Sequence, residues 1–187
     1  MLHKAAWRNR MTSEKLYFKF NRDKTIEVIL YIATQLPKPS YHPILKVLYE
    51  ADKLSLVRYG RFISGGEYYA MEHGPVSSET YDLMKHPDQR PDDAFAVGKK
   101  GTIRPLREPN LDWLSESDRE CLDEALTIVS PLEDFSERSA ASHDKAYVIA
   151  WTERGQKRRA RMSVENIAST LDETGQLLDF LMTRYDD

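Results

Sequence analysis

The sequence predicts a mostly α-helical, α+β protein: a single helical domain with a small antiparallel β-sheet or hairpin. Apolar residues recur at helical spacing in several segments, most clearly over 41–59, and glycine-containing turns separate short β-prone segments. With 41% hydrophobic residues, the 187-residue chain can bury one sizeable core. We therefore expect one domain over 21–187, preceded by a mobile N-terminal arm over 1–20.

The composition excludes several classes of protein. The chain has 27 basic and 30 acidic residues, a net charge of −3 and 10% aromatic residues, which is atypical of disordered chains. Its longest apolar run, 28–33, is far shorter than the roughly 18 residues that a membrane span needs. The single cysteine, Cys121, cannot form an intramolecular disulfide. We expect a cytoplasmic protein with no membrane partner, translated from Met1 or from Met11.

The first elements expected along the chain are a strand and a helix. Residues 15–21 alternate loosely and indicate a short edge strand. Asn21 or Asp23 then caps a helix that ends before Pro37 and Pro39. The apolar face of this helix consists of Ile26, Ile29, Leu30 and Ala33.

The strongest helical pattern spans 41–59, and Gly60 follows it at the position where a left-handed residue ends many helices. The apolar stripe of this segment is wide enough to predict burial on more than one side, so we expect it to be the central helix. The stripe consists of Ile44, Leu45, Val47, Leu48, Ala51, Leu54 and Leu56.

Two hairpin-like regions and a helix are expected next. Pro75 predicts the start of a helix that runs to about His86, because proline has no N–H to lose in a first turn. Ser77 and Ser78 are alternative caps for it. The hairpin-like regions are 61–72, read as a loop or hairpin, and the pair 95–97 and 102–106.

The remaining chain is expected to be helical. Ser115 and Asp118 have the spacing of a capping box and begin a helix that ends before Pro131. A last helical region begins near Ser163 and is interrupted by Gly175. Between these helices we expect short helices over 133–142 and 144–152 and a basic stretch over 154–161.

The sequence lacks a convincing catalytic or metal-binding motif. Its five histidines form no HExxH pair, and consecutive Ser142, His143 and Asp144 do not form a triad, because neighbours on a helix point in different directions. Cys121 lies on an apolar helical face, as core cysteines do. We therefore expect no catalytic residue, metal or cofactor. The enzymatic alternative left open is a hydrolase or a metal-dependent enzyme that uses His73 and His143.

Two segments carry candidate binding residues. Arg61 follows a helix end, and Tyr68 and Tyr69 combine apolar rings with polar tips, which fits either a recognition surface or a structural corner. The basic stretch fits an acidic protein surface, a nucleic acid, or a solvated face. Its cations are Arg154, Lys157, Arg158, Arg159 and Arg161.

A specific succession of motifs begins in the central helix. The motifs are ILKVLYEADKL at 44–54, Tyr59-Gly60-Arg61, Ser64-Gly65, Tyr68, AMEHGPV at 70–76 and Tyr81-Asp82-Leu83. In this order they resemble the Panacea domain, the SocA-like antitoxin family, over about 26–86. Farther on, Ser142-His143 and Trp151 are similar to a later family element. The chain departs from the family pattern at Ser55, Gly66 and Ser77, where members often have His, an acidic residue and Pro.

The resemblance implies a Panacea-like domain over 21–187 and a non-enzymatic antitoxin. Such a protein neutralises a cognate toxin by direct binding, and some members hand the toxin to a protease. The alternative is a transcriptional regulator that binds operator DNA through 154–161. The toxin, the interface and the oligomeric state stay open. The candidate partner-binding residues are Arg58, Arg61, Tyr68, Tyr69, His73, Arg158 and Arg159.

Overall fold

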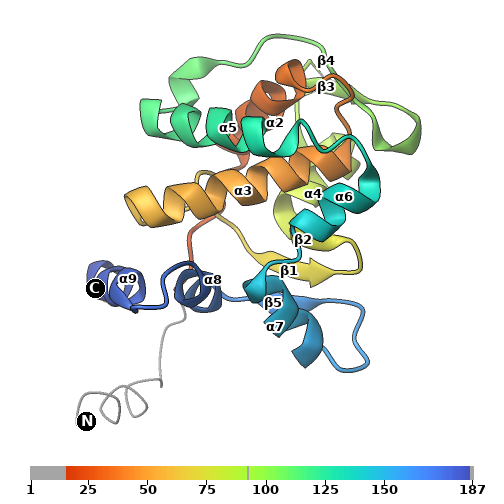
Figure 1. Ribbon diagram of the computed structural model, residues 1–187. Coiled ribbons are helices and arrows are strands. Elements are labelled where there is room, and N and C mark those ends of the chain that lie inside the picture. Colours follow the sequence, from red (N-terminus) through yellow and green to blue (C-terminus); the bar gives the residue numbers. More distant parts are fainter. Residues whose placement is uncertain (1–15, 92, 186–187) are drawn as a thin grey trace, which may run out of the picture.

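The computed structural model describes residues 16–91 and 93–185, so most of the predicted N-terminal arm lies outside the described residues. The described part is mostly helical, with one three-stranded and one two-stranded antiparallel sheet, which confirms the predicted fold class. Helix α3 (Tyr41–Tyr59) crosses the middle of the molecule. Helices α2 (Arg22–Gln35) and α5 (Glu116–Val129) lie on one side of α3, and the larger sheet lies on the other (Figure 1).

Local signals set the start of α2 and the end of α3. The Asn21 side chain accepts a hydrogen bond from the Lys24 N–H and caps α2, as predicted. Helix α3 has the predicted bounds and ends at Gly60, which adopts φ 67°. A Cβ atom on Gly60 would lie 2.6 Å from the Phe180 ring, so both the backbone angle and the packing favour glycine there.

Helix α3 is buried on more than one side, as its wide apolar stripe predicts. Ile44 and Leu48 pack in a core cluster with α2 and α5. Tyr49 and Leu56 belong to a second cluster, formed with the larger sheet and the C-terminal helices. Because one helix contributes to both clusters, it connects the two halves of the core.

The larger sheet has the strand order β2-β1-β5, with β1 (Tyr68–Met71) in the centre. Strand β2 (Gly74–Ser77) forms one edge and β5 (Ala160–Met162) the other. The prediction that Pro75 begins a helix is wrong: Pro75 lies in β2, and helix α4 (Ser78–Lys85) begins three residues later. An edge strand tolerates proline because one side of its ladder makes no hydrogen bonds within the sheet.

The smaller hairpin is confirmed, whereas the strand expected over 15–21 is wrong for its described part. Strands β3 (Phe95–Val97) and β4 (Ile103–Pro105) pair antiparallel around a short 3₁₀ turn, η2 (Lys99–Gly101). Residues 16–20 belong to no strand. The Phe18 carbonyl instead accepts a 2.7 Å hydrogen bond from the Gly66 N–H, which joins this segment to the loop after α3.

The capping box of α5 is confirmed, since the Ser115 and Asp118 side chains each accept a hydrogen bond from the other residue's backbone N–H. Gly175, at φ 84°, separates the last two helices as predicted. No helix in the described ranges is both long and apolar enough to cross a membrane. The remaining elements are η1 (Pro87–Gln89), η3 (Leu111–Trp113), α6 (Phe135–Ala141), α7 (Lys145–Glu153), α8 (Val164–Leu171) and α9 (Gln176–Arg184).

Candidate partner-binding surfaces

Arg61 belongs to a charged network that ties the end of α3 to the start of α5. Its guanidinium donates to the Asp118 carboxylate at 2.7 Å, and Lys24 Nζ lies 2.6 Å from the other oxygen of that carboxylate. Asp118 is fully buried, and burial by itself raises its pKa. Hydrogen bonds from Lys24, Arg61 and Ser115 outweigh this effect and hold the pKa below its usual value. Arg61 therefore supports the fold, although part of its side chain remains exposed.

Tyr68 lies inside the protein, since only 1% of it is exposed. Its hydroxyl donates a 2.7 Å hydrogen bond to Asp52, and the Ile63 N–H donates a 2.6 Å bond to the other oxygen of that carboxylate. Burial raises the Asp52 pKa to about 7, although both hydrogen bonds favour the ionised form. The side chain of the predicted binding residue Tyr68 is thus buried in the second core cluster and does not lie on the surface.

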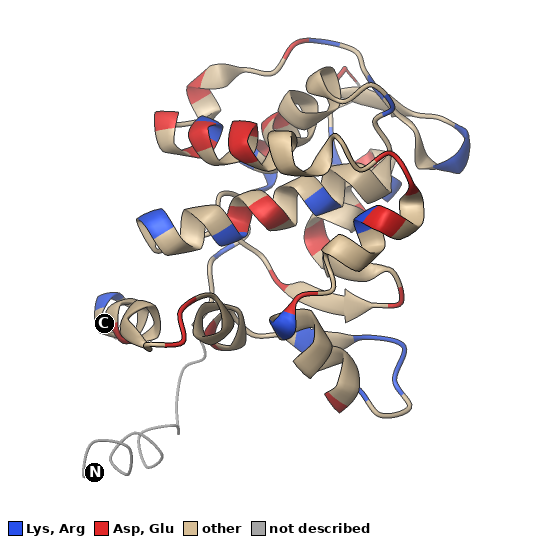
Figure 2. Ribbon diagram, in the orientation of Figure 1, with Lys and Arg blue, Asp and Glu red and all other residues tan. Residues whose placement is uncertain are grey.

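Arg58 is placed on the exposed face between α3 and α5. Its guanidinium lies 2.9 Å from Glu120 and 2.6 Å from Glu124, and the neighbouring Tyr59 hydroxyl donates to Glu120 at 2.7 Å. Acidic residues, red in Figure 2, outnumber basic ones along α5. A partner that binds Arg58 has to compete with these two carboxylates.

His73 is exposed in the turn between β1 and β2, with its ring 5.0 Å from the Phe135 ring. Beneath it, Lys46 Nζ is buried and donates to the Pro75 carbonyl at 3.1 Å, and burial lowers the Lys46 pKa to about 7. His143 stacks on Tyr147 with ring centroids 4.1 Å apart. Among the described residues, no group of three or more His, Cys, Asp or Glu side chains is arranged to hold a metal ion.

Three of the predicted binding residues meet in one pocket of about 420 Å³ beside strand β5. Arg159 lies over the Tyr69 ring, 4.4 Å from its centroid, and Arg158 precedes it in the loop between α7 and β5. This loop is the basic segment at the lower right of Figure 2. We call this site the basic pocket; its lining residues are Tyr69, Glu153, Arg154, Lys157, Arg158, Arg159, Ala160 and Arg161.

The cations of the basic pocket differ in how firmly they are held. Arg161 donates to Glu67 at 2.6 Å, and Arg154 lies 3.7 Å from the centroid of the Trp151 ring. Lys157 and Arg158 are exposed, and neither has an acidic partner within the described ranges. The pocket therefore combines two arginines held by neighbouring side chains with two exposed cations, Lys157 and Arg158, and it carries a net positive charge, which suits an acidic partner.

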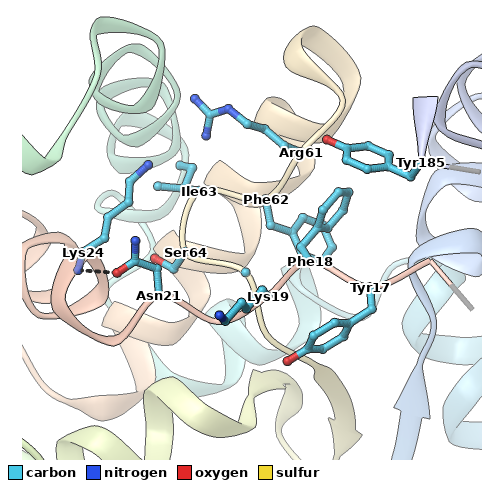
Figure 3. A pocket seen from close by; sticks show the side chains of 11 residues that line it. Tyr17, Phe18, Lys19, Asn21, Lys24, Arg61, Phe62, Ile63, Ser64 and Tyr185 are labelled. Carbon is cyan, nitrogen blue, oxygen red and sulfur yellow. Dashed lines mark hydrogen bonds between the residues drawn. The ribbon is translucent and has the colours of Figure 1, made fainter. Parts of the chain in front are cut away.

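A second concave site, which the sequence does not predict, lies where residues 17–21 cross the loop 61–65. It is a cleft of about 380 Å³ with Arg61 and Tyr185 at its mouth (Figure 3). We call it the aromatic–cationic cleft, because aromatic rings and basic side chains supply most of its walls. The segments that form it, 17–24, 61–65 and Tyr185, are about 40 and about 120 residues apart in the sequence, so no local pattern indicates it.

These features define a helical α+β domain with two concave sites that are lined by basic side chains. The chain belongs to the family described as "Antitoxin SocA-like, Panacea domain", whose model matches residues 44–151, more than half of the chain. The match begins at residue 44, not near 26, and it continues past 86 to Trp151, so it contains the later element. No curated protein and no solved structure matches the chain.

Proposed function

We infer that this protein is a cytoplasmic antitoxin that neutralises a cognate toxin by direct protein–protein binding and catalyses no reaction itself. Membership of the SocA-like antitoxin family carries this proposal. The basic pocket supports it, because arginine and aromatic side chains are the groups that most often anchor protein interfaces. The toxin surface that fits this pocket is acidic.

A growth assay tests the proposal. The open reading frame next to this one is expressed from an inducible promoter, with and without this protein. The neighbour alone should stop growth, and co-expression should restore it. A neighbour that is harmless, or whose toxicity is unchanged by co-expression, contradicts the antitoxin function.

Charge reversal in the basic pocket should weaken toxin binding. We expect Arg158→Glu with Arg159→Glu to raise the toxin Kd roughly 10–100-fold, because reversed charges repel an acidic surface. Titration calorimetry with the purified toxin measures the change. Lys38→Glu with Lys99→Glu is the matched control, since both lysines are exposed and the change in net charge is the same. Equal affinities of the two double variants contradict a role for the basic pocket.

The same pocket favours one alternative, a regulator that binds operator DNA through 154–161. Five cations line the pocket and fit phosphates as well as carboxylates. A gel shift on the upstream DNA should then appear at micromolar protein and weaken steeply with salt.

A role in delivering the toxin to a protease is a separate extension of the antitoxin proposal. It predicts a shorter toxin half-life when the antitoxin is present.

A further inference from the structure

The aromatic–cationic cleft has the composition of a ligand site and is separate from the basic pocket. Eleven residues line it, and none of them is acidic, although acidic residues outnumber basic ones in the chain. Three of the lining residues are basic: Lys19, Lys24 and Arg61. Figure 3 shows them arranged around one opening, with Ser64 and Asn21 between them.

The charges at the cleft are incompletely balanced. Lys24 and Arg61 share one carboxylate, that of Asp118, so this trio keeps a net charge of +1. Arg61 also donates to Ser117 at 2.9 Å, but at least two of its five N–H groups have no partner among the described residues. Lys19 is exposed and adds a second positive charge. The three basic lining residues and their ion-pair partner Asp118 thus sum to a net charge of about +2, which favours an anion.

Two polar features at the back of the cleft favour the same kind of ligand. The Ser64 hydroxyl belongs to a residue that is only 1% exposed, and it has no hydrogen-bond partner within the described part of the chain. Buried hydroxyls are rarely left without a partner. The 14-residue helix α2 begins at the cleft, after Asn21, and directs the positive end of its dipole there.

The other wall of the cleft is aromatic. Phe18 and Phe62 are buried and meet edge to face with their ring centroids 5.0 Å apart. Tyr17 and Tyr185 stand at the rim with 52% and 41% of their surface exposed. Exposed rings beside a buried apolar floor offer surface from which a ligand displaces water.

We propose that the aromatic–cationic cleft binds an amphipathic anion, namely a carboxylate attached to an aromatic or aliphatic group. The carboxylate lies toward Lys19, Lys24 and Arg61, and the apolar group lies against the aromatic wall. This chemistry is offered by a free organic acid and also by neighbouring acidic and apolar side chains of a polypeptide. The inference does not depend on the proposed antitoxin function.

Titration of the full chain with small probes, followed by NMR, tests this site. We expect 3-phenylpropionate to bind with a Kd on the order of 1 mM, which is typical of a ligand of about 11 non-hydrogen atoms. Acetate lacks the ring and 3-phenylpropan-1-ol lacks the charge, so each should bind at least roughly tenfold more weakly. Lys19→Glu and Tyr17→Ala should each raise the Kd at least roughly fivefold, and Lys38→Glu, the matched control, should leave it unchanged.

A second arm identifies the source of the anion. Acetyl-Asp-Phe-Asp-amide is compared with its uncharged analogue, acetyl-Asn-Phe-Asn-amide. Tighter binding of the acidic peptide than of 3-phenylpropionate assigns the site to a polypeptide, and the reverse order assigns it to a free acid. The proposal is overturned if neither anion binds, if the uncharged analogues bind equally well, or if Lys19→Glu and Tyr17→Ala change nothing.

Discussion

Asp118→Ala is expected to lower the free energy of unfolding by about 3–5 kcal/mol. The buried carboxylate joins Lys24 at 2.6 Å and Arg61 at 2.7 Å, and its removal leaves two partly buried cations facing each other. The substitution also removes half of the capping box that begins α5. Urea denaturation of both proteins at pH 7, followed by circular dichroism, measures the difference.

Glu116→Ala is the matched control, because Glu116 lies in the same first turn of α5 but is exposed. It should lower stability by no more than about 0.5 kcal/mol. The difference in the free energy of unfolding between wild type and Asp118→Ala should also become smaller at acidic pH. Because the folded-state pKa of Asp118 is lowered, its stabilisation is complete above the unfolded pKa of about 4 and is lost as pH falls through the folded pKa. Similar losses in Asp118→Ala and Glu116→Ala contradict a stabilising role for this network.

Asp52 is expected to affect the pH dependence of stability in the sense opposite to Asp118. Compared with Asp52→Asn, wild type should lose stability as the pH rises. Burial raises the Asp52 pKa from 3.8 to about 7, so the folded protein holds a proton that the unfolded chain releases between these values. The contribution of a group with a raised pKa to the free energy of unfolding is fully present below pH 4 and is lost as the pH rises through 7. The stability of wild type relative to Asp52→Asn should therefore fall by at most about 4 kcal/mol between pH 4 and pH 7.

Tyr68→Phe provides an internal control for the Asp52 prediction. The Tyr68 hydroxyl donates one of the two hydrogen bonds that favour the ionised carboxylate. Removal of this hydroxyl should raise the Asp52 pKa further and extend the upper limit of the pH-dependent range, while the lower limit stays near the unfolded pKa of about 4. Urea denaturation at half-unit pH steps follows all three proteins. Parallel profiles of wild type and Asp52→Asn would show that the carboxyl of Asp52 titrates alike in the folded and unfolded states.

The sequence predicts the helices best where the signals are local. The predicted bounds of α3 agree with the observed ones because the wide apolar stripe and Gly60 lie within one segment. The cap of α2 at Asn21 and the capping box of α5 agree for the same reason, since each hydrogen bond joins residues three positions apart. Gly175 likewise separates α8 from α9 by its own backbone conformation.

The errors occur where distant segments decide the structure. Strand β5 forms at the end of the basic stretch because residues 160–162 pair with β1, about 90 residues earlier. Its three residues are fewer than the four to eight over which alternation predicts a strand. Pro75 joins β2 because it pairs opposite Ala70, which outweighs its preference for a helix start. Residues 16–20 resemble a strand but only cross the loop at Gly66.

The sequence by itself determined the fold class, the central helix and the family, because periodicity, caps and motif order are written in contiguous residues. Only the tertiary structure decided which candidate residues share a surface. It placed Tyr68 inside and paired Arg58 and Arg61 with acidic side chains of α5. It also brought Tyr69, Arg158 and Arg159 into one pocket, because the pairing of β1 with β5 joins residues about 90 positions apart.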